Sequence, residues 1–128
     1  MATLFYKADC FIFNTHWWEK RRTDFEAYAA GFPALSPEAA EWIRESLPGI
    51  KAVAIDTLSI ENISQGSDNG FRVHTALLDP SRGDYTIRII EDVNPEPLIG
   101  KKLVRGFMSP LRIHADACLC NVIFEIEE

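Results

Sequence analysis

Residues 35–57 read LSPEAAEWIRESLPGIKAVAIDT, and this stretch decides the fold class that the sequence predicts. Ser36 is a good N-cap residue, and Pro37 suits the first helical position because its missing N–H would have no partner there. Pro48 and Gly49 end the helix, and the β-branched run IKAVAI follows as a strand. A helix, a tight turn and a buried strand in this order are the ordinary unit of an α/β protein. The apolar period of the helix predicts a buried face made of Ala39, Trp42, Ile43, Ser46 and Leu47.

Further short elements are predicted on both sides of this unit. Runs of β-branched and aromatic residues predict strands at residues 10–15, 85–91, 103–113 and 119–127. A short helix is expected around Phe25 and Tyr28, ended by Gly31, and a second one in VHTALL at 73–78. The polar stretch SQGSDNG at 64–70 is expected to be an exposed loop. We therefore predict one compact α/β domain over residues 1–128.

Composition excludes several classes of partner. The chain has a net charge of -6, whereas nucleic-acid binders usually carry a basic patch that meets phosphate charge. The cluster Lys20-Arg21-Arg22 is interpreted as solvated surface. No secretory leader pattern and no apolar run of membrane-spanning length is present, so we expect a soluble, cytoplasmic protein with no membrane partner.

The three cysteines favour a reduced protein. Their number is odd, and Cys118-x-Cys120 is too tight for the usual zinc knuckle or redox pair. Strand alternation predicts that both of these thiols lie on one strand face, where cysteine behaves as a small hydrophobe. Together with Cys10 they are interpreted as structural.

Motifs for nucleophilic or phosphate chemistry are absent from the sequence. Ser59 has no flanking glycines of the kind that form a nucleophile elbow, and the glycines are scattered singly rather than gathered in a phosphate-binding loop. His74 and Glu91 form a better candidate, because imidazole and carboxylate are a normal ligand pair for zinc or manganese. Two ligands do not make a metal site, and both residues can equally be a helix start and a strand end.

Structural alternatives stand beside the other candidates. Asp56, just past a strand, can hold ligand or simply accept N–H groups at a turn. Glu91 can pair with Arg88 or Arg112, and a lone histidine such as His16 is more often structural than functional. The remaining candidates are the possible metal-binding pair His114-x-Asp116 and three tryptophans expected in the core or at an interface, Trp17, Trp18 and Trp42.

Several segments, taken in order, resemble the second half of a known family. They are ADCFIFNTHWW, FPALSPEAAEWIRE, GIKAVAIDTLSIE, HTALL, IIEDVNPEPLIGKKL and SPLRIHADACLCNVIFEIE. The resemblance is to the cyclase family of metal-dependent hydrolases, which includes kynurenine formamidase and isatin hydrolase, and it extends over nearly all of the chain. It implies the C-terminal half of the swivelling β/β/α fold, zinc or manganese as cofactor, and hydrolysis of amide or cyclic amide bonds.

The resemblance also implies roles for particular residues. His74 and Glu91 correspond to family metal ligands, while Asp56, Trp17 and His16 are expected to contact substrate or to support the site from behind. The family motif H-x-G-T-H-x-D-x-P-x-H, which supplies the other ligands and the catalytic histidine, does not occur in this sequence.

Further departures from the family pattern are His16 and Ala54 where the family has glycine, and Cys118-Leu119 near its usual proline. Two hypotheses follow. In the first, another chain or further sequence completes a metal-dependent hydrolase. In the second, the chain is a non-catalytic, truncated family member that self-associates or binds a small ligand. Both leave a homo-oligomer or a complementary chain as the expected partner.

Overall fold

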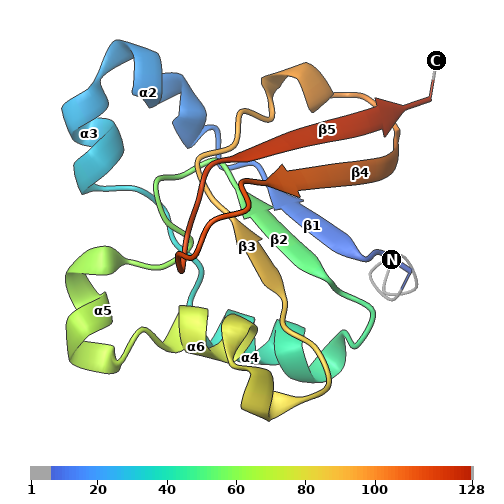
Figure 1. Cartoon of the computed structure of the whole chain (residues 1–128). Helices are drawn as coiled ribbons and strands as arrows, with labels where there is room; N and C mark the ends of the chain where they lie inside the picture. Colours follow the sequence, from blue (N-terminus) through green and yellow to red (C-terminus); the bar gives the residue numbers. More distant parts are fainter. Residues whose placement is uncertain (1–6, 128) are drawn as a thin grey trace. The chain divides into compact units, whose positions relative to one another are not determined.

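The computed structural model describes residues 7–127 and shows an α/β protein with a parallel sheet, covering helices and a β-hairpin (Figure 1). The predicted α/β class is therefore confirmed. The chain divides into two compact units, Met1–Pro95 and Glu96–Glu128. None of the helices formed by residues 7–127 is long and apolar enough to cross a membrane.

A three-stranded parallel sheet forms the centre of the first unit. Its strands are β1 (Cys10–Phe13), β2 (Ala52–Ile55) and β3 (Arg88–Ile90), arranged in the order β1-β2-β3. Each predicted strand is thus present, although β3 is shorter than expected. Because the strands are parallel, their carboxyl ends reach the same edge of the sheet, where open α/β sheets usually bind ligands.

Two helices pack against one face of this sheet and against each other, as Figure 1 shows: α4 (Pro37–Ser46) and α6 (Arg72–Leu78). The register places Phe11, Val53 and Ile89 side by side on that face. The core buried between sheet and helices contains Ala40, Ile43, Leu47, Ile50, Val53, Ile55, Ile60, Val73, Ala76, Leu77 and Ile87.

Helix α4 confirms the predicted cap but not the whole predicted face. The Ser36 hydroxyl accepts a hydrogen bond from the Ala39 N–H, and Pro37 opens the helix. Trp42, however, is 50% exposed, so it does not belong to the core, and its alternative place at an interface stays a prediction. The buried face of α4 includes Arg44 instead. The Arg44 guanidinium lies 3.5 Å from the Leu77 carbonyl oxygen near the end of α6. The Arg44 cation interacts favourably with the negative carboxyl end of α6, and this interaction offsets the cost of burying its charge.

The predicted loop at 64–70 is wrong, because residues 64–69 belong to the helix α5 (Ile63–Asn69) and Gly70 is its C-cap. The Asn62 side chain caps it by accepting from the Ser64 N–H, and Gly70 ends it with φ of 73°. Gly66 is buried against the ring of Phe71, which a Cβ at this position would overlap. Capping at both ends and one close contact thus make a helix from a sequence without an apolar period.

Short helical elements join β1 to α4: η1 (Trp17–Glu19), α2 (Lys20–Thr23) and α3 (Phe25–Ala30). The last of these confirms the helix predicted around Phe25 and Tyr28. Tyr28 is the buried residue of this segment. The 3-10 turn η2 (Pro80–Arg82) lies between α6 and β3.

The second unit is built around an antiparallel hairpin of β4 (Leu103–Pro110) and β5 (Cys120–Ile126), preceded by η3 (Glu96–Leu98). Both predicted strands are confirmed. Cys118 lies before β5, so the prediction that it shares a strand face with Cys120 is wrong. All three cysteines are free thiols, and burial, helped by Asp9, raises the pKa of Cys10.

Candidate functional site

The candidate site lies where β2 and β3 end, because Asp56 directly follows β2 and Glu91 directly follows β3. The side chains of this edge come from the strand ends, from the IDTLSIE segment at 55–61 and from the first turn of α6. They form two groups, one around Asp56 and one around His74.

Asp56 is fully buried and has both carboxylate oxygens occupied by protein donors. Oδ1 accepts from the Thr15 N–H at 2.9 Å and from its hydroxyl at 2.8 Å. Oδ2 accepts from the N–H groups of Trp17 at 2.9 Å and Trp18 at 3.3 Å. Asp56 therefore shapes the turn from β1 into η1, as the structural alternative for this residue predicts.

His16 and Trp17 lie on that turn. His16 adopts a left-handed conformation with φ of 62°, which explains why glycine suits this position. Its side chain is exposed and faces Glu19 at 3.5 Å. The Trp17 indole donates to the Tyr28 carbonyl at 3.1 Å, and Lys20 Nζ lies 4.3 Å from the ring centroid. These contacts hold the turn together, and the predicted substrate role of both residues stays a prediction.

Glu61 organises the second group, although the sequence did not single it out. Its carboxylate is almost completely buried and accepts from the N–H groups of Val73 at 3.2 Å and His74 at 3.1 Å. It thereby caps the positive end of α6, whose own N-cap residue, Phe71, provides no side-chain hydrogen bond. Glu61 Oε2 also lies 2.8 Å from His74 Nδ1.

This last contact fixes the orientation of the His74 ring. When Nδ1 carries a proton and donates it to Glu61, a neutral imidazole keeps its lone pair on Nε2. Nε2 lies 3.4 Å from Glu91 Oε1. A buried carboxylate behind a histidine, with the opposite ring nitrogen facing outward, is the usual support of a metal-binding histidine.

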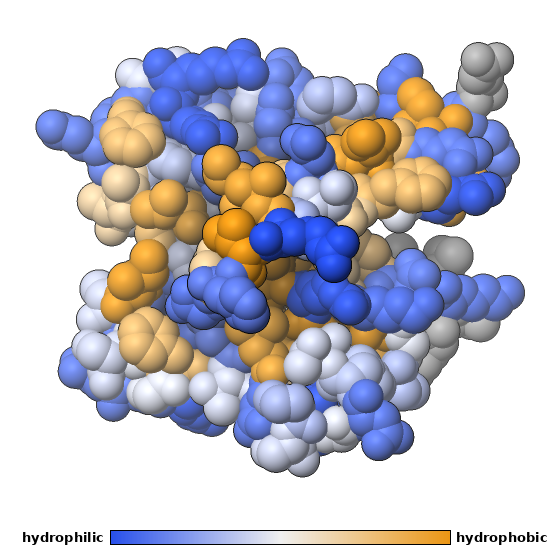
Figure 2. All heavy atoms as spheres, viewed as in Figure 1, coloured by the Kyte–Doolittle hydropathy of each residue, from blue (hydrophilic) through white to orange (hydrophobic). Residues whose placement is uncertain are grey.

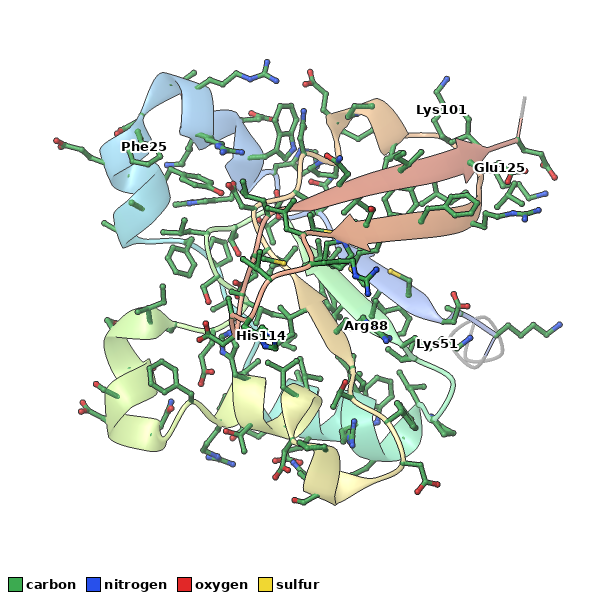
Figure 3. All side chains as sticks on the ribbon, viewed as in Figure 1. Phe25, Lys51, Arg88, Lys101, His114 and Glu125 are labelled. Carbon is green, nitrogen blue, oxygen red and sulfur yellow. The ribbon has the colours of Figure 1, made fainter. Side chains whose placement is uncertain are left out.

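Glu91 approaches His74 from the end of β3. Its Oε1 accepts from the Ser59 hydroxyl at 2.9 Å and from the Ile60 N–H at 2.8 Å. Within residues 7–127, no hydrogen bond to Oε2 is found. Arg88, labelled in Figure 3, is not its partner, because strand alternation turns residues 88 and 91 to opposite faces of the sheet.

Electrostatics follow from this geometry. The Glu91 carboxylate raises the pKa of His74 to about 8, against burial, which lowers it, and Glu61 adds to the increase. Burial acts to raise the pKa of Glu91, but hydrogen bonds from His74, Ile60 and Ser59 outweigh it and leave this pKa below its ordinary value. Near pH 7 the two groups therefore form a charged pair, about one third exposed.

Outside these two groups, contacts of Asp92, the residue after Glu91, tie the end of β3 to α2 and α3. The Tyr28 hydroxyl lies 2.5 Å from Asp92 Oδ1, and the Arg21 guanidinium lies 3.0 Å from Oδ2. Asp92 has a φ of 58° and hydrogen-bonds through its N–H to the Thr57 carbonyl. Glu91 thus faces His74, whereas its neighbour Asp92 connects the end of β3 to α2 and α3.

The donor set fits part of a metal centre but not a whole one. His74 Nε2 and Glu91 are nitrogen and oxygen donors that zinc or manganese accepts. In the part of the chain that the structure describes, no group of three or more His, Cys, Asp or Glu residues could hold a metal ion. A hydrolytic zinc site needs about three protein ligands and one open position.

The part of the chain that contains β1, α4, β2 and Glu61 matches a known protein family. Residues 5–62 match the Putative cyclase family. The match covers less than half of the 128 residues and ends before His74 and Glu91, so the resemblance of the later segments stays a prediction. Comparisons with curated proteins and with solved structures give no significant match.

Sequence reasoning selected His74, Glu91 and Asp56, and the structure brings the first two together. It missed Glu61 and rejected Ser59 as a nucleophile without finding its role as a donor to Glu91. The available signal was the place of Glu61 at the end of IDTLSIE, a segment that carries the family resemblance.

Proposed function

We propose that the cyclase-like chain contributes His74 and Glu91 as two ligands of a zinc or manganese centre. The remaining ligands come from one of three sources: sequence of this protein outside residues 7–127, a second copy of the chain, or a complementary chain. The assembled centre hydrolyses an amide or cyclic amide bond. The observation that supports this proposal most strongly is the Glu61–His74 contact of 2.8 Å, which aims Nε2 toward Glu91.

Each residue has a separate task in this proposal. Glu61 holds the Nδ1 proton and the ring orientation, Ser59 and Ile60 fix the Glu91 carboxylate, and the Oε2 atom of Glu91 is available for a ligand. Bound zinc or manganese would supply Lewis acidity and an acidified water. The chain's own residues would supply two donors in fixed positions.

Metal binding by the intact chain tests the proposal. We expect titration calorimetry with Zn²⁺, and paramagnetic resonance with Mn²⁺, to show weak binding that His74→Ala abolishes. His114→Ala is measured in parallel, because His114-x-Asp116 is the other possible metal-binding pair in the sequence, and loss of binding in this variant alone would assign the metal to that pair. Equal binding by wild type and H74A would reject His74 as a ligand.

The hydrolytic part needs its own measurement. Aryl formamide hydrolysis is assayed in two preparations. One is the isolated chain, and the other is the chain co-purified with any protein that stays bound to it. We expect activity only in the second preparation, and its loss in both H74A and Glu91→Gln. Metal binding without activity in any preparation would retain the ligand pair and reject the hydrolase.

A second candidate function is a non-catalytic cyclase-like module that self-associates or binds a small ligand. It is favoured by the direct His74–Glu91 approach of 3.4 Å and by the two further donors on Glu91 Oε1, which satisfy these groups without metal. Under this alternative, added Zn²⁺ or Mn²⁺ leaves the melting temperature unchanged. A rise in melting temperature that requires His74 would instead support the metal centre.

A further inference from the structure

The hairpin of the second unit exposes an apolar pair on one of its faces. The register pairs Arg105 with Glu125, Phe107 with Ile123, and Ser109 with Asn121. Residues opposite each other on neighbouring strands share a face, so these pairs form three consecutive rows. Phe107 is 54% exposed and Ile123 is 64% exposed, and we call this surface the Phe107–Ile123 face.

The opposite face of the hairpin is more covered. Met108, Cys120, Val122 and Phe124 alternate with the exposed residues and are half-buried. The Phe124 ring lies over Gly106, where a Cβ would come within 2.9 Å of it. The hairpin thus packs its own side chains on one face and leaves the Phe107–Ile123 face to solvent.

Figure 2 shows apolar side chains, in orange, gathered over the hairpin and bordered by charged ones, in blue. Glu125, labelled in Figure 3, forms part of this border and lies 2.8 Å from Arg105 Nε. A two-stranded hairpin is marginally stable by itself, so covering an exposed aromatic–aliphatic pair would stabilise it.

We propose that the Phe107–Ile123 face is a docking surface for the same face of a second copy of this chain. A twofold axis parallel to the strands would set Arg105 opposite Glu125 of the copy and Phe107 opposite Ile123 of the copy. Ser109 and Asn121 would meet as donor and acceptor in the third row. Each row can pair with the same row of the copy, because the two residues within a row are complementary to each other.

Charge also favours this unit as the place where copies meet. The whole chain carries a net charge of -6, which repels a second copy. Residues 96–128 contain four Lys or Arg and five Asp or Glu residues, so the second unit is nearly neutral. The contact is small, and we expect a weak dimer with a dissociation constant in the micromolar range or above.

Sedimentation velocity of the full chain, from micromolar to millimolar concentration, tests the surface. We expect a monomer–dimer equilibrium that the double variant F107T/I123T weakens by about tenfold or more. Threonine keeps the β-propensity of both positions while removing apolar area. Leu119→Thr is the control, because Leu119 is 81% exposed but lies outside β5, and this variant should dimerise like wild type.

Mixing two charge variants separates contact between chains from hairpin stability. R105E and E125R each place like charges in one row, so each should dimerise several-fold more weakly than wild type. An equimolar mixture should recover dimer, because only the contact between chains becomes complementary again. A monomer at every concentration, a dimer insensitive to F107T/I123T, or a mixture without recovery would each overturn the proposal. None of these outcomes depends on the metal-binding measurement.

Discussion

Asp56 and Glu91 follow neighbouring parallel strands, yet the structure uses them differently. Asp56 is fully buried, and both its oxygens accept from the turn at Thr15, Trp17 and Trp18. Glu91 is one third exposed and faces His74, with its partners on Oε1. Position at the carboxyl end of a strand therefore does not identify a ligand. The number of carboxylate oxygens left without a protein donor is what separates the two residues in this structure.

The largest expected effect comes from Asp56→Ala. The substitution leaves the Thr15 hydroxyl and the Trp17 and Trp18 N–H groups without their acceptor, at a cost of about 3–4 kcal/mol in the free energy of unfolding. Urea unfolding followed by tryptophan fluorescence measures it. Asp56→Asn keeps one acceptor oxygen and should lose roughly half as much. A loss below about 1 kcal/mol for the alanine variant would show that solvent replaces these bonds.

Glu61→Gln should come next, with a loss of about 2–3 kcal/mol. An amide presents one oxygen and one NH₂ group, so it opposes at least one of the donors at the start of α6. Unfolding of this variant is compared with Glu45→Gln, because the Glu45 side chain is exposed on α4 and its loss should matter little. Equal stability of the two variants would refute the capping role of Glu61.

Local sequence predicted the elements better than their contacts. The helix at 37–46 was predictable because Ser36, Pro37, Pro48 and Gly49 mark both of its ends within a short stretch. Helix α5 was missed because its polar residues have no apolar period, and because two glycines within a polar stretch, Gly66 and Gly70, are typical of a loop.

The role of Glu61 could not be predicted locally. Its partners Val73 and His74 follow twelve and thirteen residues later, and their approach depends on how α6 packs. The His74–Glu91 contact was predictable in outline, because the family resemblance implies that both residues are ligands of one metal. The hairpin strands were predicted, whereas their register, and with it the Phe107–Ile123 face, was not.

His74→Gln should have a smaller effect on stability, about 1–2 kcal/mol. The glutamine amide can still donate to Glu61 or to Glu91, but it cannot carry the positive charge that both carboxylates face. Thermal unfolding with and without Zn²⁺ shows whether the response to the metal depends on the His74–Glu91 group or on Asp56. We expect H74Q to lose any response to the metal, whereas Asp56→Asn should keep it. If D56N loses the response as well, the β2 end also belongs to the binding site.

The smallest expected effect is the pH dependence that His74 gives to stability. Its pKa rises from 6.5 to about 8 on folding, so its contribution is fully present below pH 6.5 and is lost as pH rises through 8. The size is about 1 kcal/mol after allowance for partial exposure of the pair. The pKa of Glu91 is lowered, so its contribution acts in the opposite sense and is lost only on acidification below its ordinary value of 4.5. Urea unfolding from pH 6 to 9 should therefore show wild type losing stability while H74Q stays level, and parallel curves would mean that the charged pair adds nothing to the fold.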